Sequence, residues 1–386
     1  MIGTVFGHHR RLAVILTMCS LGWMLTIELG GGQEAGSAGS RLSASLRRQY
    51  PGTPTTATSA GLDWLGRGGR RASMRFRAET YPGPATIGPR PKREWIRRLQ
   101  FVHRHAPPAL QTALALPPAG LMKDGYVVYP SQVSAGGGPA GACSWENSGC
   151  LRTPEHGFNE SFDIVHPDPN TWVVNFDDGP LPPSETLYKI LDELELKATH
   201  FWIGGNVLKY RELALKAARR GDHLAVHTWS HSHLTSLTNH QILGELGWTM
   251  QIIADLTGKV PRFFRPPYGN IDNRVRAIAK HVFGLETVIW NWDSVDWGLN
   301  QTYATGDQVD RPEGAALGRT VAQVAEDIAR FAGQPAAAGL ILEHELSLEA
   351  VEAFRLSFGA VRARHFGAVG PLPVCLEGGQ AAWYQQ

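Results

Sequence analysis

Short apolar segments alternate with helix-like segments through the second half of the chain, and this alternation restricts the possible folds more than any other feature. One apolar run leads into Asp177 and Asp178, and further runs predict strands at 199–203, 223–226, 262–264, 286–292 and 339–342. Helical periodicity between them predicts helices at 184–196, 207–220, 239–256, 274–280 and 320–331. Strands that alternate with helices form a parallel sheet, open or closed into a barrel, so the expected fold class is α/β.

Residues with acid–base or ligand chemistry follow these strands, at the position where α/β barrels carry their active sites. Asp177 and Asp178 end the first strand, which Gly179-Pro180 stops. His227 directly follows a later strand, and His231 comes four residues after it. One carboxylate and two histidines are the ligands of a catalytic zinc site that keeps an open position for water, and the second carboxylate is placed to act as a base. The pattern predicts a metal-dependent hydrolase.

The residue types alone leave several assignments open. Asp177 and Asp178 could exchange the roles of base and ligand, and His233 could replace His231. Imidazole and carboxylate ligands suit zinc, cobalt or another divalent first-row ion, so they do not name the metal. An adjacent aspartate pair before Gly-Pro also forms turns, which is its ordinary role when it stands alone.

The segment 265–269, at another strand end, could add two further groups to such a site. Arg265 follows the strand 262–264 and could keep Asp177 ionised through a charge-assisted pair. Pro266 and Pro267 stiffen the backbone, which would let the amide of Tyr268 point at a developing oxyanion.

The last predicted strand delivers His344, a candidate acid for protonating a leaving group. A nearby carboxylate would raise the pKa of this histidine, and Asp296 or Asp293 could supply that carboxylate. Leu342 and Trp297 could wall a small apolar pocket beside it, or could pack in the core like any other apolar side chain.

The N-terminal part of the chain has a different character. A basic flank precedes an apolar run at 12–27, which predicts a secretory signal peptide or signal anchor within residues 1–30. Residues 31–142 are basic and of low complexity, and we expect a largely disordered stalk or pro-segment there. The catalytic domain is expected at 143–376, followed by a short polar tail at 377–386.

Charge is divided unevenly along the chain. Residues 1–150 hold 17 Lys/Arg against 7 Asp/Glu, a net charge of +10, whereas residues 151–386 hold 20 against 28, a net charge of −8. This division indicates a basic tail on an acidic folded domain, and it argues against a nucleic-acid partner.

Cysteines and sequons fit a secreted protein. Outside the apolar run, the chain has Cys143, Cys150 and Cys375, an odd number that leaves one thiol over if a single disulfide forms. Asn159 and Asn300 lie in glycosylation sequons, which matter only in a secreted chain.

Five motifs occur in one order along the chain, and together they carry a family resemblance. They are Asn175-Phe176-Asp177-Asp178-Gly179-Pro180, His227-Thr228-Trp229-Ser230-His231, Arg265-Pro266-Pro267-Tyr268-Gly269, Asp293-Ser294-Val295-Asp296-Trp297 and Leu342-Glu343-His344. This set resembles the NodB-homology polysaccharide deacetylases (carbohydrate esterase family 4), and the residues between the motifs resemble fungal chitin deacetylases. The resemblance covers about 145–376 and implies a distorted (β/α) barrel.

The resemblance also implies a role for each matching residue. Asp177 would be the base, tuned by Arg265, and the amide of Tyr268 would bind the oxyanion. His344 would be the acid, tuned by Asp296. The implied metal ligands are Asp178, His227 and His231, and Leu342 and Trp297 would line the acetyl pocket.

The implied reaction removes acetyl from N-acetylglucosamine units of chitin or chitooligosaccharides, giving chitosan and acetate. We expect a zinc or cobalt enzyme that acts as a monomer on cell-wall polysaccharide, extracellular or tethered to the plasma membrane by its N-terminal segment. Alternatives are deacetylation of another polymer such as acetylxylan, or a non-catalytic glycan-binding relative.

Many relatives bridge a cysteine before the first strand to one near the C-terminus. This chain has His166-Pro167-Asp168-Pro169 there, so Cys375 must pair with Cys143 or Cys150, or stay free.

Overall fold

The computed structural model of the protein describes residues 76–120, 122–123, 126–127, 142–152, 163–299, 318–334 and 337–385. The predicted signal segment and the sequons at Asn159 and Asn300 lie outside these residues. Within the described part of the chain, no helix has both the length and the apolar character needed to cross a membrane.

Five parallel strands pair in the order of the chain. Each strand lies beside its successor, so the sheet order is β4-β5-β6-β7-β8. Helices connect the strands, as expected for parallel neighbours that need a crossover. The strands are β4 (Asn175–Asp177), β5 (Thr199–Trp202), β6 (His223–Val226), β7 (Phe263–Phe264) and β8 (Glu286–Thr287).

Short ladders and single bridges bring the two ends of this sheet together. After β8 the chain continues to β9 (Trp292–Asp293), which pairs in parallel with β10 (Ile341–Leu342). Two residues beyond β10, His344 forms a parallel bridge to Asp177 of β4. In addition, β3 (Thr171–Val173) pairs with β11 (Ala368–Gly370), and β1 (Met122–Lys123) with β2 (Tyr126–Val127). The predicted α/β class is confirmed, and the parallel strands form a distorted ring.

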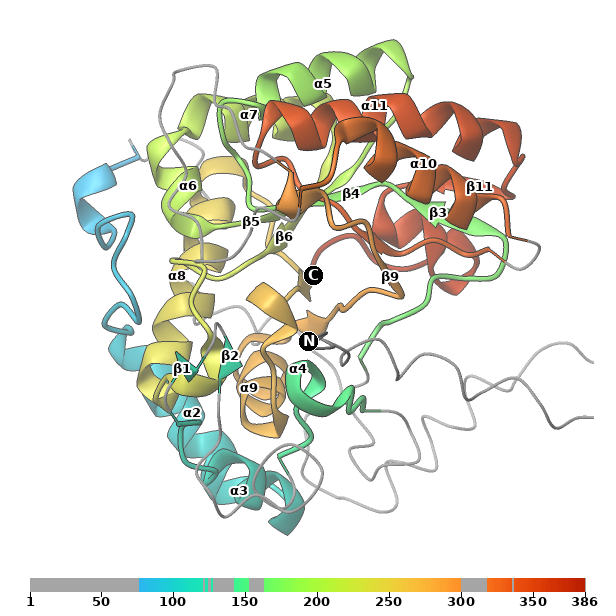
Figure 1. Cartoon of the computed structure of the whole chain (residues 1–386). Coiled ribbons are helices and arrows are strands. Elements are labelled where there is room, and N and C mark those ends of the chain that lie inside the picture. Colours follow the sequence, from blue (N-terminus) through green and yellow to red (C-terminus); the bar gives the residue numbers. More distant parts are fainter. Residues whose placement is uncertain are drawn as a thin grey trace, which may run out of the picture. The chain divides into compact units, whose positions relative to one another are not determined.

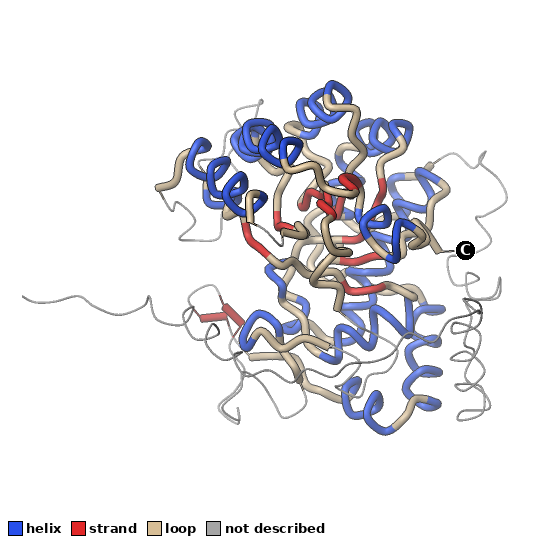
Figure 2. The backbone as a smooth tube through the Cα atoms, turned by 90° about the vertical axis from the view of Figure 1, so that its right-hand side faces the viewer, coloured by secondary structure: helices blue, strands red, loops and turns tan. Residues whose placement is uncertain are grey.

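The interior of the ring is a compact apolar layer. Alternate residues of a strand point to opposite faces, and each of several strands contributes one inward side chain. Leu372 and Cys375, from the short helix η9 (Leu372–Cys375), pack against this layer. Figure 2 shows the parallel strands gathered in the middle of the domain with helices around them. The inward residues are Val173, Phe201, Ala225, Phe263, Val288 and Leu340, all essentially buried.

Two larger apolar clusters join the outer faces of the strands to the helices. Figure 1 shows α5, α7, α10 and α11 together on one side of the strands, and α2, α3, α8 and α9 gathered on another side. The helices are α2 (Arg93–His105), α3 (Pro108–Leu114), α4 (Trp145–Ser148), α5 (Ser184–Glu193), α6 (Gly204–Lys209), α7 (Arg211–Arg220), α8 (Asn239–Thr257), α9 (Asn273–Ala277), α10 (Val321–Ala332) and α11 (Leu348–Ala363). Shorter turns are η3 (Ala78–Thr80), η5 (Leu234–Ser236), η6 (Pro267–Gly269), η7 (Ile278–Val282), η8 (Asp296–Gly298) and η10 (Glu377–Gly379).

Local signals explain where the main helices begin and end. Thr238 and Gln241 form a capping box at the start of α8, and Gly258 ends that helix in the left-handed conformation. The single helix predicted at 207–220 is instead divided into α6 and α7, because Tyr210 leaves the helical conformation with φ −117° and ψ 49°. The predicted strand 286–292 appears as β8 and β9 with two-residue ladders.

The expectation of a largely disordered segment at 31–142 is wrong for residues 76–120. Apolar side chains at helical spacing in α2 and α3 pack into the cluster formed with α8 and α9. The prediction of disorder followed from the basic composition of this segment, which does not reveal the spacing of its apolar residues. The side chains concerned are Trp95, Leu99, Leu110 and Leu114.

Residues 76–92 form an extended strap that lies along α8. The Trp229 indole donates to the Gly83 carbonyl (2.9 Å), and the Trp248 indole donates to the Arg90 carbonyl (2.9 Å). Helix α8 has no side chain at Gly244, and a Cβ there would collide with the carbonyl oxygen of Pro89. The strap can therefore lie against α8 only because residue 244 has no side chain.

The predicted polar tail at 377–386 also packs onto the domain. The carbonyl of Trp383 lies 2.9 Å from Nε2 of His223, and the Tyr384 hydroxyl accepts a hydrogen bond from the Leu224 amide (3.1 Å). These aromatic residues reach the start of β6, at the opposite end of that strand from His227. The tail therefore packs against the N-terminal end of β6.

The three cysteines among the described residues form one disulfide and leave one thiol. Cys143 is bonded to Cys150, and Cys375 is a buried free thiol. Burial raises the pKa of the Cys375 thiol to about 11, so it stays protonated at neutral pH.

Replacement of Gly244 tests whether the strap lies against α8 in solution. We expect Gly244→Ala to lower the free energy of unfolding by about 1–3 kcal/mol, because the added methyl group must displace the strap. Gly359→Ala is the matched control, since this glycine lies in α11 with no atom within 4 Å of an added Cβ. The control should gain up to about 1 kcal/mol from helix propensity. Urea unfolding measures both, and an equal gain in the two variants would contradict the strap.

Candidate active site

Asp178, His227 and His231 come together at the C-terminal ends of β4 and β6. Oδ1 of Asp178 lies 3.1 Å from Nε2 of His231 and 3.3 Å from Nε2 of His227. One ligand atom from each residue falls within 4.8 Å of the others, a spacing that a single metal ion can bridge. The Asp178 Oδ1 atom is buried and accepts no hydrogen bond of good geometry, which also fits a cation between the three groups.

The two histidines are oriented for this role by their other ring nitrogens. Nδ1 of His227 lies 2.8 Å from the Arg265 carbonyl, and Nδ1 of His231 lies 3.0 Å from the Tyr268 hydroxyl. Each ring therefore has an oxygen partner at Nδ1 and presents Nε2 to Asp178, the arrangement usual for metal-binding histidines. The imidazoles outweigh the effect of burial and hold the pKa of Asp178 well below its usual value.

Asp177 is adjacent to this group and is bonded to a buried arginine. Nη1 of Arg265 donates to Oδ1 of Asp177 at 2.8 Å, and both side chains are almost completely buried. Nη2 of Arg265 donates to the Ile289 carbonyl (3.1 Å), and the guanidinium lies 4.1 Å from the centre of the Phe201 ring. The second carboxylate oxygen, Oδ2, is 3.9 Å from Nε2 of His227. Arg265 thus fixes Asp177 with one oxygen turned toward the histidine.

His344 and Asp296 form a second buried pair. Oδ1 of Asp296 lies 2.6 Å from Nδ1 of His344, and Oδ2 accepts from the backbone amide of His344 at 2.8 Å. Burial opposes a charge on the imidazole, but Asp296 outweighs it and raises the pKa of His344 to about 10. Asp293 has other partners, because its Oδ1 accepts from the Val295 amide (2.8 Å) and the Trp297 indole (3.2 Å).

The remaining predicted site residues lie on the same loops. Leu342 is buried in β10, and its carbonyl accepts a hydrogen bond from the Ser294 hydroxyl (2.7 Å). Trp297 follows Asp296 in η8. Tyr268 is partly exposed, with its backbone in the left-handed region at φ 60°. Their roles in binding an acetyl group stay predictions.

His233, which sequence reasoning left as an alternative ligand, lies outside the group of three. Its ring stacks on Tyr268 with centroids 4.0 Å apart and planes 7° apart. Its Nε2 faces Oε1 of Glu146 at 3.9 Å. The geometry therefore favours His231 as the ligand.

Sequence reasoning missed the residue that holds the loop between the two histidines. Glu245 of α8 is buried, and its Oε2 accepts from the amides of Trp229 (2.8 Å) and Ser230 (2.9 Å). Its Oε1 accepts from the Ser230 hydroxyl (2.7 Å) and from the amide of Gly88 in the strap (2.7 Å). A glutamate inside a helical pattern normally indicates the exposed face, so this contact left no signal in the sequence.

A second missed cluster supports the segment that carries His344. The backbone amide of Glu345 donates to the Asp177 carbonyl (3.1 Å). In the Glu345 side chain, Oε1 accepts from the Trp202 indole (3.1 Å). The same oxygen lies 2.9 Å from Nδ1 of the buried His200. Burial alone would lower the pKa of His200, but Glu345 and Asp222 outweigh it and raise that pKa to about 9. Glu345 and His200 thus form a buried ion pair behind the site.

Strained backbone is concentrated in these loops. Asp178, Thr228, His231 and Tyr268 all have φ between 59° and 74°, in the left-handed region that side chains with a Cβ seldom adopt. Each such residue costs on the order of 1–3 kcal/mol and persists only where its surroundings hold it. Such clustering is typical of functional sites.

Comparisons with known proteins agree with the resemblance seen in the motifs. Residues 165–287 match the family model described as polysaccharide deacetylase. The chain is 43% identical over 195 residues to chitin deacetylase 3 of Cryptococcus neoformans, which is 50% of this chain and 45% of that protein. It is 40% identical over 178 residues to chitin deacetylase 1 of Saccharomyces cerevisiae, covering 46% and 52%. The chain thus spans about half the length of the curated relatives it matches.

Among solved structures, the chain is similar to the chitin deacetylase from the fungal pathogen Colletotrichum lindemuthianum. The identity is 19% and the TM-score 0.47, over 56% of this chain and 91% of that one. The matched residues 165–287 include Asp177, Asp178, both histidines of the candidate metal group and Arg265. The part of the chain that is similar to polysaccharide deacetylases therefore includes the whole candidate metal group.

Proposed function

We propose that this protein removes acetyl groups from N-acetylglucosamine units of chitin by metal-dependent hydrolysis, releasing acetate and leaving chitosan. The observation that carries the proposal is the placement of a three-residue ligand group, Asp178, His227 and His231, beside the buried Asp177–Arg265 pair. Relatives named chitin deacetylase, at 40–43% identity, support chitin as the substrate.

Zinc is the proposed metal, with cobalt as a second possibility. Two imidazoles and one carboxylate suit either ion, and three protein ligands leave a position open for water or substrate. When bound, such an ion would supply Lewis-acid activation of water and of the acetamide carbonyl.

The residues around the ligand group divide the proton transfers between them. Asp177, kept in position by Arg265, accepts the proton of the attacking water. The amide of Tyr268 donates to the oxygen that becomes negatively charged. His344, held protonated by Asp296, gives its proton to the departing amine. The two buried pairs thus supply the base and the acid separately.

The proposal extends to where the protein acts and how it recognises the acetyl group. Leu342 and Trp297 would contact the acetyl methyl. The Cys143–Cys150 disulfide supports an oxidising compartment, in keeping with a secreted protein that acts on cell-wall polysaccharide.

Replacement of the base tests the proposed reaction. We expect Asp177→Asn to lower kcat for acetate release from chitooligosaccharides by about 10²–10⁴-fold, the usual contribution of a general base. Asp327→Asn is the control, because it removes a carboxylate that pairs with Arg319 and Arg330 at the surface of α10. The control should keep wild-type activity. Full activity in Asp177→Asn would contradict the proposed mechanism.

Removal of the metal tests the ligand group. A chelator should abolish acetate release from chitooligosaccharides, and added Zn²⁺ should restore it in the wild type but not in His231→Ala. Acetylated xylan serves as the comparison substrate. Faster release from acetylated xylan than from chitooligosaccharides would replace the proposed substrate while keeping the chemistry.

The Asp296–His344 pair predicts a shift in the pH profile. Removing the carboxylate in Asp296→Asn lowers the pKa of His344, so the acid loses its proton at lower pH. The alkaline limb of kcat/KM against pH should therefore move to lower pH by about 1–3 units. Profiles of the zinc-loaded wild type and variant measure this shift. An unmoved alkaline limb would exclude His344 as the acid tuned by Asp296.

A further inference from the structure

The side chain of Tyr268 contacts a candidate metal ligand directly. Its hydroxyl oxygen lies 3.0 Å from Nδ1 of His231, and the two rings meet edge to face with centroids 4.6 Å apart. When Nε2 of His231 faces a cation, Nδ1 keeps its hydrogen and donates it to the Tyr268 oxygen. This contact is separate from the expected use of the Tyr268 backbone amide.

His233 stacks on the tyrosine ring, and Glu146 lies beside His233. The His233 ring lies flat against Tyr268, and its Nε2 is 3.9 Å from Oε1 of Glu146. The other oxygen, Oε2, accepts a hydrogen bond from the Asn270 side chain, two residues after Tyr268. Glu146 therefore lies within ion-pair distance of the ring that stacks on Tyr268 and accepts a hydrogen bond from the loop that carries Tyr268.

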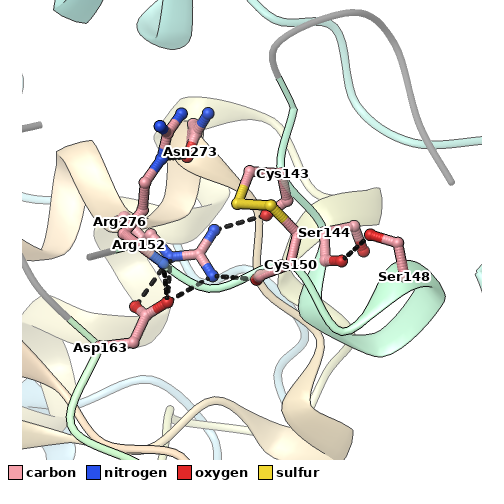
Figure 3. The surroundings of a disulfide bond; sticks show 8 residues. All are labelled: Cys143, Ser144, Ser148, Cys150, Arg152, Asp163, Asn273 and Arg276. Atoms are coloured by element: carbon pink, nitrogen blue, oxygen red, sulfur yellow. Dashed lines mark hydrogen bonds and ion pairs between the residues drawn. A yellow bond between two sulfur atoms is a disulfide. The ribbon is translucent and has the colours of Figure 1, made fainter. Parts of the chain in front are cut away.

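Glu146 belongs to the loop that the Cys143–Cys150 disulfide closes. As Figure 3 shows, Arg276 reaches this loop and donates to the carbonyls of Cys143 (2.5 Å) and Cys150 (3.1 Å), while Asp163 pairs with Arg276. A buried arginine with these partners fixes the ends of the loop on α9.

A neighbour in the same loop contacts the segment after Tyr268 as well. The indole of Trp145 fills the space that a side chain at Gly269 would need, and it packs edge to face on Trp290 with centroids 4.7 Å apart. The disulfide loop thus contacts the segment 268–270 through both Trp145 and Glu146.

We propose that the hydroxyl of Tyr268 is a positioning group for the metal ligand His231, and that His233 and Glu146 of the disulfide loop keep that hydroxyl in place. The inference rests on the proposed metal site and adds a role for residues that the five motifs do not assign. Partners of this kind at the outer nitrogen of a ligating histidine typically change metal affinity or activity by about 10–100-fold.

Zinc affinity of the metal-stripped protein tests the proposal without reference to catalysis. Tyr268→Phe removes only the hydroxyl and leaves the ring and the backbone amide. We expect its Kd for Zn²⁺, measured by competition with a chromophoric chelator, to rise about 10–100-fold. Tyr384→Phe is the control, because it removes a tyrosine hydroxyl that bonds the Leu224 amide at the far end of β6. Its Kd should equal that of the wild type.

The stacked ring is tested by a pair of substitutions at one position. His233→Ala removes the surface that holds Tyr268 and should weaken Zn²⁺ binding, whereas His233→Phe restores a flat ring and should recover most of the affinity. This pair also decides the question if Tyr268→Phe fails to fold, as judged by its thermal unfolding. A wild-type Kd in folded Tyr268→Phe, or in His233→Ala, overturns the inference. Failure of the wild type itself to bind Zn²⁺ would instead reject the proposed metal site.

Discussion

The buried guanidinium of Arg265 connects several strands at the end of the sheet that carries the candidate site. Arg265 is fully buried, and an uncompensated buried charge costs several kcal/mol, so its partners must be held where they are. Those partners come from different strands: Asp177 from β4, the Phe201 ring from β5, and the Ile289 carbonyl from the segment after β8. The backbone carbonyl of Arg265 also lies within hydrogen-bond distance of Nδ1 of His227. One side chain and its backbone therefore orient both the proposed base and a proposed ligand.

The components of the site that follow strand ends were predictable from the sequence. Asp177, His227, Arg265 and His344 each stand after an apolar run, and parallel strands bring their C-terminal ends to one edge. Glu245 and Glu146 were not predictable, because each acts on residues distant in the sequence. Glu146, for example, contacts Asn270, 124 residues away. Neither periodicity nor a short motif records such a contact, and an isolated glutamate normally indicates a solvent-exposed position.

The fold shows the same division between local and distant information. Apolar periodicity, a local feature, located α8 and α10 closely, and in the structure a capping box begins each of them. In the segment 76–120 the many basic residues predict disorder, whereas the helical spacing of buried apolar residues such as Trp95 and Leu99 in α2 allows it to fold. The position of the strap depends on a residue still farther away in the sequence. Its place depends on a bare glycine, Gly244, about 150 residues later, and a glycine in a helix sequence does not reveal what fills the space above it.

The strap and the candidate metal site share one carboxylate, which makes the N-terminal segment part of the site's support. Oε1 of Glu245 accepts hydrogen bonds from the Gly88 amide of the strap and from the Ser230 hydroxyl. Oε2 accepts from the two backbone amides of the loop between His227 and His231. That loop contains two residues in the left-handed conformation, Thr228 and His231, which require an external restraint. A buried carboxylate is retained at low cost when donors saturate both of its oxygens. The amide of Gly88 completes that set, so the folding of a segment outside the family match contributes to the conformation of His231.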